Sequence, residues 1–410
     1  MSEIASNATS EWETPDFRAA PAAFRTAMKV LRSNWDTGNL DVVMPGGRRL
    51  RLRGAKEGPA AELIIKDYKA VGRVMSGADI GFAEGYMAGE WDTPDLPALL
   101  TAFTWNLDRI GRLMAGNPLV KAWNFLIHFM RRNDREGSRR NIHAHYDLGN
   151  RFYELWLDRT MTYSSARFER ADQPLEEAQH EKYAALARSI ELKSDQTVLE
   201  IGCGWGGFAE FAAKEVGARV TGITISQAQY DYARERLFKQ GLAEKADIQL
   251  IDYRDVQGRF DRVASIEMFE AVGEEYWPTY FGKIHEVLSP GGRAGLQIIT
   301  IKDELFEHYR AHADFIQKYV FPGGMLPSEE KLKAQTDRAG LDWTGLNRFG
   351  ECYADTLNQW LHRFDAVWEQ VKAQGFDERF RKLWRFYLAY CEAGMRTGRT
   401  NVVQLGLSRA

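Results

Sequence analysis

Short apolar runs alternate with amphipathic stretches in the second half of the chain. TVLEIG, RVTGITI and ADIQLID have the pattern of short buried strands, and the helical stretches GFAEFAAKEVG and SQAQYDYARERLFKQGL lie between them. Strands that alternate with helices form parallel sheets with helices on both faces. The pattern therefore predicts an α/β fold with a mostly parallel sheet for residues 141–410.

The first third of the chain has a different pattern. Residues 18–130 mix strand-like and helical runs, and LDVVMPGGRRLRLRG predicts a hairpin around its Pro-Gly-Gly turn. We expect them to form a smaller α+β domain. Residues 1–17 are polar and acidic, which predicts a disordered tail. Residues 131–140, RRNDREGSRR, are charged throughout and predict an exposed basic linker.

Composition and charge argue against several classes of protein. A formal net charge of −3 lacks the basic excess that nucleic-acid-binding proteins usually carry. The three cysteines form no CxxC pair and no cluster with histidine, so we expect neither a disulfide nor a metal site. The N-terminus has neither the basic nor the apolar part of a signal peptide, and a cytoplasmic location is expected.

One apolar helical stretch precedes the motifs, at residues 118–130. It is well short of the roughly 20 residues that a membrane span needs. Its apolar face could lie on a membrane surface or pack on the next domain, and the sequence leaves both open. The arginines that follow could likewise contact anionic headgroups or be simply solvated.

A glycine-rich turn follows the first apolar strand, in VLEIGCGWGG. Gly202, Gly204 and Gly206 lack the side chains that would keep a ligand away from the backbone. Dinucleotide-binding folds, methyltransferases and purely structural turns all use this device. The turn alone therefore does not identify a ligand.

The ends of the next two strands separate these possibilities. A dinucleotide site needs an Asp or Glu about 20 residues further on to hold the ribose, but Thr224 and Ser226 stand there. Glu200 fits the E-x-G-x-G turn of class I methyltransferases, so S-adenosylmethionine is favoured over NAD or FAD. After the third strand, Asp252 and Tyr253 could contact adenine or simply cap a loop.

From about His143 to the C-terminus, the chain resembles the cyclopropane-fatty-acyl-phospholipid synthase and mycolic acid methyltransferase family. The resemblance lies in HYDLGNRFYELWLDRTMTYSSARF, LEIGCGWGGFAEF, IDYRDVQGRFDRVASIEMFEAVG, FIQKYVFPGGMLPS and CYADTLNQWLHRF. It implies a class I methyltransferase, Rossmann-like fold for residues 141–410. It also implies that residues 18–130 bind lipid and form a homodimer.

The resemblance further implies a reaction and a set of binding residues. The reaction transfers a methyl group from S-adenosylmethionine, a co-substrate, to the double bond of an unsaturated phospholipid acyl chain at the inner membrane surface. His143 and His145 could line the cofactor entrance or cap a helix. Contacts with the methyl donor are expected from Tyr163, Ser164, Glu200, Gly202, Gly204, Gly206, Thr224, Ser226, Gln229, Tyr253 and Arg254.

The chemistry requires proximity, exclusion of water and stabilisation of positive charge. An alkene is a poor nucleophile, so the enzyme must align it with the methyl donor and keep water from the resulting carbocation. Aromatic faces stabilise a desolvated cation by up to about 2 kcal/mol each. The aromatic segments 353–368 and 384–390 could supply such faces or could be core.

A base must then remove a proton from the cation. The resemblance implies a bound bicarbonate held by a Cys, a Glu, a His and a Tyr. Glu270 and Tyr353 match two of these, whereas Ser165 and Gln297 replace the cysteine and the histidine, which weakens the case for bicarbonate. Glu270 is the first choice for the base. Glu267 is a weaker candidate, because it could be a simple surface carboxylate.

The proton that leaves determines the product. Loss from the added methyl group closes a cyclopropane ring, and loss from elsewhere leaves a methyl- or methylene-branched chain. GLQIIT and FIQKYVFPGGMLPS resemble the branching members of the family, and both outcomes stay open. Two further functions also stay open, a small-molecule N-methyltransferase and a catalytically silent lipid-binding homologue.

Overall fold

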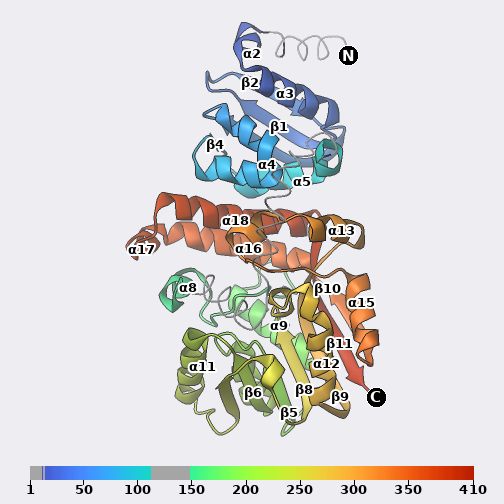
Figure 1. Cartoon of the computed structure of the whole chain (residues 1–410). Coiled ribbons are helices and arrows are strands. Elements are labelled where there is room, and N and C mark those ends of the chain that lie inside the picture. The colour runs from blue at the N-terminus through green and yellow to red at the C-terminus, as the bar shows by residue number, and fades with distance from the viewer. Residues whose placement is uncertain (1–11, 13, 112–147) are drawn as a thin grey trace. The chain divides into compact units, whose positions relative to one another are not determined.

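The computed structural model describes residues 12, 14–111 and 148–410 (Figure 1). They divide into two compact units: unit 1 holds the residues up to 111 with His312–Phe315 and Gly375–Thr397, and unit 2 holds the rest. Within these ranges, no helix combines the length and apolarity needed to cross a bilayer. Outside them lie the predictions made for residues 118–130, for the linker 131–140, and for His143 and His145.

Unit 1 is built on a four-stranded sheet in the order β2-β1-β3-β4. The RLRLR sequence of β2 alternates, so that Leu50 and Leu52 are buried while the arginines are exposed. β1 and β2 pair antiparallel, which confirms the predicted hairpin. The elements of this unit are β1 (Thr37–Val43), β2 (Arg49–Arg53), β3 (Lys56–Ile65), β4 (Trp91–Asp92), α2 (Pro15–Ala19), α3 (Ala22–Asn34), α4 (Lys69–Met87), α5 (Leu96–Gly111) and α18 (Glu378–Arg396).

Ordered structure begins earlier than the sequence predicted. Trp12 and Phe17 are buried, and their rings meet edge to face at 5.8 Å. The Arg32 guanidinium lies 4.9 Å from the Trp12 ring, and Thr14 caps α2. The prediction of a disordered tail over residues 1–17 is therefore wrong for Trp12 and for 14–17, because two aromatic side chains anchor this polar segment.

Helix α18 belongs to unit 1, although the sequence placed it in the domain 141–410. The ring of Phe386 lies 6.0 to 6.5 Å from the rings of Phe82, Tyr86 and Trp91. Aromatic packing against α4 and β4 therefore fixes the place of this helix. The prediction of a single domain boundary near the linker is therefore wrong for α18.

Unit 2 contains a seven-stranded sheet in the order β10-β11-β9-β8-β5-β6-β7 (Figure 1). The neighbours from β9 through β7 pair in parallel, and β11 is antiparallel to β9 and β10. This confirms the predicted mostly parallel sheet. The strands are β5 (Thr197–Ile201), β6 (Arg219–Thr224), β7 (Ala246–Leu250), β8 (Phe260–Ile266), β9 (Leu288–Ile301), β10 (Leu341–Arg348) and β11 (Thr400–Arg409).

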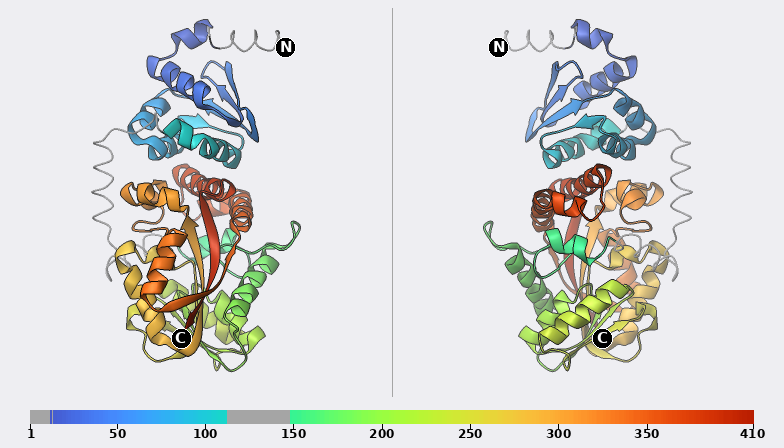
Figure 2. Two further views of the ribbon diagram at one scale, coloured as in Figure 1. Left: turned by 90° about the vertical axis from the view of Figure 1, so that its right-hand side faces the viewer. Right: turned by 90° about the vertical axis from the view of Figure 1, so that its left-hand side faces the viewer.

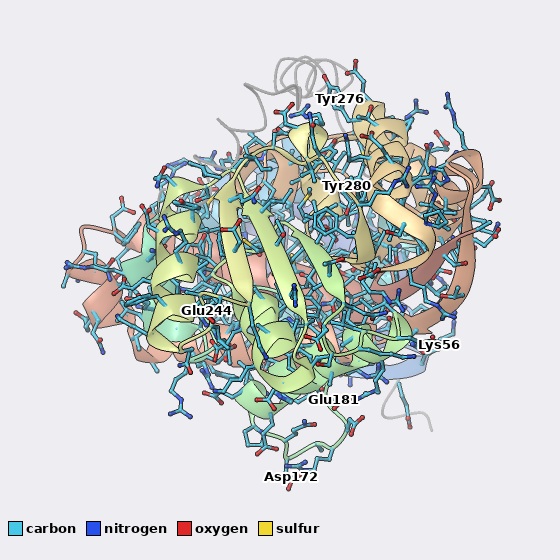
Figure 3. All side chains as sticks on the ribbon, turned by 90° about the horizontal axis from the view of Figure 1, so that it is seen from below. Lys56, Asp172, Glu181, Glu244, Tyr276 and Tyr280 are labelled. Atoms are coloured by element: carbon cyan, nitrogen blue, oxygen red, sulfur yellow. The ribbon has the colours of Figure 1, made fainter. Side chains whose placement is uncertain are left out.

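Helices cover both faces of this sheet (Figure 2). Val198 of β5 belongs to the core cluster that includes α9, α10 and α11, and Leu199 belongs to the one that includes α12 and α15, because successive strand side chains point to opposite faces. Figure 3 accordingly shows Glu181 of α9 and Tyr280 of α12 on opposite sides of the strands. The longer helices are α9 (Leu175–Ser189), α11 (Gln227–Lys239), α12 (Trp277–Val287), α13 (Asp303–Ala311), α15 (Glu329–Arg338) and α16 (Gly350–Ala366). The shorter ones are α8 (Asn150–Trp156), α10 (Gly207–Phe211), η1 (Ala212–Val216), η2 (Tyr253–Asp255), η3 (Phe269–Ala271), η4 (Glu274–Tyr276), α14 (Phe315–Tyr319) and α17 (Trp368–Lys372).

Candidate active site

The carboxyl ends of β5, β6, β7 and β8 meet at one edge of the sheet, where open α/β sheets bind their ligands. At the end of β5, the N–H groups of Gly202 and Cys203 donate to Ile223 O at 3.0 and 2.9 Å. Gly202, Gly204 and Gly206 have φ angles of +80°, +51° and +81°. Glycine adopts such left-handed backbone readily, so the shape of the turn depends on these residues.

The three glycines differ in their surroundings. A Cβ on Gly202 would lie 2.6 Å from Cγ of Met268, so the turn contacts the loop after β8. A Cβ on Gly206 would lie 3.1 Å from Ala233. A Cβ on Gly204 would meet no heavy atom of the described residues within 4 Å, which leaves the backbone there open to a ligand.

Glu200, just before the turn, is a buried carboxylate with an unsatisfied oxygen. Its side chain is buried, and its Oε2 has no hydrogen-bond partner within the described ranges. Burial raises the pKa of Glu200 well above its usual range, against the positive charge of Arg236. Buried polar atoms are normally hydrogen-bonded, so this oxygen fits a site for a polar ligand.

Thr224, Ser226 and Gln229 come together at the end of β6. Thr224 Oγ1 donates to Gln229 Oε1 at 2.9 Å and accepts from Ser226 N at 3.2 Å. Ser226 caps α11, because its Oγ accepts from Gln229 N at 3.4 Å. All three side chains are buried, and β6 pairs with β5, so they lie beside the glycine turn.

Tyr253 and Arg254 follow β7, and their side chains contact neighbouring residues. The Arg254 guanidinium makes two hydrogen bonds with Asp252, at 2.8 and 2.6 Å. Tyr253 lies edge to face with Tyr280 at 5.4 Å, and burial raises its pKa to about 12. The Arg254 guanidinium also lies 5.6 Å from the ring of Tyr276. Both residues stand at the predicted strand end.

Glu267 lies at the centre of the residues predicted to hold the base. Its Oε1 accepts hydrogen bonds from Ser165 N and Gln297 Nε2, each at 2.8 Å. Its Oε2 accepts a hydrogen bond from Tyr353 OH at 2.9 Å. We define these four residues as the base pocket. The interpretation of Glu267 as a simple surface carboxylate is therefore wrong.

Ser165 and Gln297 donate to Glu267 in different ways, one through its backbone and the other through its side chain. Ser165 uses its backbone N–H, whereas its hydroxyl donates to Ala166 O at 2.9 Å. Gln297 directs its amide nitrogen at Glu267, because its Oε1 accepts from Gln404 Nε2 at 3.1 Å. Gln404 faces Gln297 across the β9–β11 pairing. The sheet itself therefore orients this donor.

A buried lysine lies near the pocket. Lys182 of α9 is 0% exposed and donates to Ser164 Oγ at 2.6 Å. Burial lowers its pKa to about 7, against the charges of Glu267, Asp158 and Glu200. Burial raises the pKa of Glu267, and the charge of Lys182 and the hydrogen bonds oppose that rise. The two groups therefore stabilise each other in their charged forms.

Lys182 and Gln404 were not predicted from the sequence, although each leaves a signal in it. In LEEAQHEKYAALARS, Lys182 follows Leu175 by seven positions and Ala178 by four, which puts it on the apolar stripe of the helix. Gln404 interrupts the apolar strand NVVQLGL. A polar residue at a core position is a sign of a buried hydrogen bond or ion pair.

The loop after β8 holds Glu267 in a strained conformation. Its φ angle is +48°, which residues other than glycine rarely adopt. Its N–H donates to Gln297 O at 2.8 Å, which ties the loop to β9. Strain of this kind costs about 1–3 kcal/mol and gathers at functional sites.

Glu270, the first choice for the base, is hydrogen-bonded outside the base pocket. Its Oε1 accepts from Ile299 N, and its Oε2 has no partner in the described part of the chain. Burial, and then the charge of Glu267, raise its pKa to about 8. Glu270 is therefore mainly protonated at neutral pH, in the form that cannot accept a proton.

A cluster of aromatic rings joins the glycine turn to the base pocket. Trp205 of the turn lies 5.1 Å from Tyr153, and Trp360 of α16 lies 6.2 Å from Tyr353. Of the predicted aromatic segments, 353–368 supplies Trp360, whereas 384–390 lies on α18 in unit 1. The aromatic cluster consists of Tyr153, Trp156, Tyr163, Trp205 and Trp360.

Two curated relatives match most of the chain. The tuberculostearic acid methyltransferase UfaA1 of Mycobacterium tuberculosis is 37% identical over 87% of this chain and 85% of its own length. The cyclopropane-fatty-acyl-phospholipid synthase of Escherichia coli is 33% identical over 85% of this chain and 88% of its own length. The resemblance predicted from the motifs is therefore confirmed.

A solved structure and a family model match the region that carries the site. The mycolic acid cyclopropane synthase CmaA1, complexed with SAH and CTAB, is similar with a TM-score of 0.63 at 30% identity. The similarity covers 66% of this chain and 98% of CmaA1, and it confirms the class I methyltransferase fold. Residues 133–405 match the family model described as mycolic acid cyclopropane synthetase. The chain belongs to the mycolic acid cyclopropane synthetase family.

Proposed function

We propose that this chain transfers a methyl group from S-adenosylmethionine to the double bond of an unsaturated phospholipid acyl chain. The contact between Gly202 and Met268 carries the proposal, because it sets the glycine turn against the loop of the base pocket. Glu267 directly precedes Met268 in that loop. A donor site beside a proton acceptor fits a reaction that adds methyl to carbon and then removes a proton.

S-adenosylmethionine would be held at the ends of β5, β6 and β7. The open backbone at Gly204 and the unsatisfied oxygen of Glu200 fit a polar nucleoside ligand. Bound there, this co-substrate supplies an electrophilic methyl carbon. We assign further contacts to the remaining residues predicted from the motifs, Tyr163, Ser164, Gly202, Gly206, Thr224, Ser226, Gln229, Tyr253 and Arg254.

The aromatic cluster is suited to protect the cation that follows. The π electrons of the double bond form the new bond to the methyl carbon as the carbon–sulfur bond breaks, and a carbocation remains on the acyl chain. Aromatic faces stabilise such a charge by up to about 2 kcal/mol each without attacking it. Trp156 and Trp360 are fully buried, so the cluster also excludes water.

Loss of a proton then completes the reaction in one of two ways. When the added methyl group loses a proton, its C–H electrons close a cyclopropane ring. When a chain carbon loses a proton instead, a methyl-branched alkene forms. When a hydride first migrates to the cationic carbon, loss of a proton from the methyl group gives a methylene branch. The names of the relatives, a tuberculostearic acid methyltransferase and a cyclopropane synthase, support both outcomes.

We also place the protein at the inner membrane surface as a homodimer, with residues 18–130 as the part that meets lipid. The substrate class supports the location, since phospholipid chains lie in a bilayer. Unit 1 exposes the large apolar side chains of Met75, Trp105 and Leu107, which suit contact with an apolar surface. Flotation of the protein with phospholipid vesicles and measurement of its mass in solution test the two parts separately.

Labelled S-adenosylmethionine tests the proposed reaction. Vesicles of a monounsaturated phospholipid should take the label into the lipid fraction. Vesicles with the same headgroup and saturated chains should stay unlabelled, because they offer no π electrons. The proposal fails if the unsaturated lipid gains no label while the protein binds S-adenosylmethionine in a calorimeter.

A further inference from the structure

We infer that Glu267 is the base that removes the proton, and that it does so in place of a diffusible anion. The inference rests on the proposed function and names the group that completes it. Three donors from separate parts of the fold converge on this carboxylate: Ser165 N, Gln297 Nε2 and Tyr353 OH, at 2.8, 2.8 and 2.9 Å. They stand at three of the four positions to which the resemblance assigned a bound bicarbonate, the fourth being Glu270.

The carboxylate already fills the place that an anion would take. Oε1 of Glu267 accepts two of the three hydrogen bonds and Oε2 accepts the third. A second anion would have to displace this side chain or lie against it in a buried setting, where two negative charges repel strongly. The chain thus supplies the base as one of its own side chains.

The surroundings fix the direction of the Glu267 side chain. The strained backbone, with φ at +48°, is held by the bond from Glu267 N to Gln297 O at 2.8 Å. Gln404 Nε2 donates to Gln297 Oε1 at 3.1 Å and so keeps the amide nitrogen of Gln297 facing the carboxylate. Because its side chain is held in one orientation, Glu267 stays aligned with the proton that it removes, and little of the reaction rate is lost to misalignment.

Charge also favours the ionised form of Glu267. The buried ammonium of Lys182 opposes the effect of burial on the carboxylate, and the described residues bring no comparable cation to Glu270. Glu270 lies three residues away in the same loop, and its pKa is raised to about 8 by burial and then by the charge of Glu267. Two carboxyl groups in such different surroundings are suited to different roles.

The proton transfer balances without a further reactant. Glu267 takes a proton either from the added methyl group, whose C–H electrons then close the ring, or from a chain carbon next to the cationic centre, whose C–H electrons then form a double bond. The lipid becomes neutral, Glu267 becomes a carboxylic acid, and loss of its proton to solvent restores the base. Tyr353 donates a hydrogen bond to Oε2, which steadies the carboxylate before the transfer.

Rescue by small anions tests the inference. Glu267→Ala leaves three donors around an open space that formate or bicarbonate can enter, whereas Glu267→Gln fills that space with an amide. Both variants should lose about 10²–10⁴-fold in the rate of lipid methylation. Added formate or bicarbonate should restore about tenfold or more to Glu267→Ala alone, by the same principle. The unchanged chain should keep its rate in buffer freed of bicarbonate.

Three results would overturn the inference. They are a normal rate in either variant, a need of the unchanged chain for added bicarbonate, and loss without rescue in Glu267→Ala while calorimetry shows intact binding of S-adenosylmethionine. Loss without rescue would mean that Glu267 only positions other groups and does not itself remove the proton. Failure of the proposed function has a separate sign, since the unchanged chain would then label no lipid.

Discussion

Lys182 and Glu267 depend on each other for their charge. Burial drives Lys182 toward its neutral form and Glu267 toward its acid form, and the opposite charge of the partner resists both shifts. Removal of either partner leaves the other as an unpaired buried charge, which is strongly unfavourable. Lys182 therefore acts on the base through its charge, as a positioning residue.

Lys182→Met should move the acid limb of the pH–rate profile upward. Without the ammonium the pKa of Glu267 rises, and a base acts only when ionised, so activity falls at a higher pH than before. We expect a shift of about one pH unit or more in kcat/KM. Lys193→Met changes an exposed lysine of the same unit and should leave the limb in place. An acid limb common to all three proteins would rule out the coupling.

Glu270 should make stability fall as pH rises. Its pKa is about 8 in the folded protein against an ordinary 4.5, so the folded state holds this proton more tightly. The stabilisation is complete below the ordinary pKa and is lost as pH rises through about 8, by up to about 1.4 kcal/mol per unit. Glu270→Gln should flatten this fall in urea unfolding, whereas Glu330→Gln, at an exposed site, should not. Equal slopes in all the proteins would contradict the shift.

Much of the base pocket was predictable from motifs, but its central residue was not. Ser165, Gln297 and Tyr353 were placed together by resemblance, and they share one partner in the structure. The direction of the Glu267 side chain depends on a positive φ angle, which the local sequence does not predict for a glutamate. Glu270 was preferred because its position matches the family motif, while its environment is visible only in the fold.

At the scale of elements, the turn after β5 combines a conformational and a steric requirement. Gly202 and Gly204 both have positive φ, but only Gly202 would bring a Cβ against Met268. The alternation from β5 to β7 was predictable because strand and helix periods are local properties. The contact with the loop after β8 joins residues far apart in the sequence and was not.

The two glycines give a matched pair of variants. Gly202→Ala should lower the melting temperature, because backbone strain of about 1 kcal/mol adds to a clash with Met268 at 2.6 Å. Gly204→Ala carries the strain alone, so it should fold but bind S-adenosylmethionine more weakly. Thermal melting and calorimetry separate the two effects. Normal binding by Gly204→Ala would show that the ligand does not approach this backbone.

At the scale of the whole molecule, segments that are far apart in the sequence belong to the same unit. The chain returns to unit 1 at Gly375–Thr397, after most of unit 2. Helical periodicity predicts which face of α18 is apolar, but it does not reveal what that face meets. Domain boundaries assigned from consecutive stretches of sequence therefore missed this return.

Phe386→Ala tests the place of α18. The ring packs against Phe82, Tyr86 and Trp91, so its removal should destabilise unit 1 by about 3–5 kcal/mol. Arg379→Ala changes an exposed position on the same helix and should stay within about 0.5 kcal/mol of the unchanged chain. Urea unfolding followed by tryptophan fluorescence measures both. Similar small losses in the two variants would mean that α18 is not part of this core.

Mass spectrometry of lipid made with trideuteromethyl S-adenosylmethionine tests the transfer to a double bond most directly. A monounsaturated acyl chain should gain one carbon, which keeps two deuterons when the methyl group loses the proton and three when a chain carbon loses it. Saturated chains should gain none. Deuterium in the headgroup, or an unsaturated chain that gains no carbon, would contradict methyl transfer to the double bond.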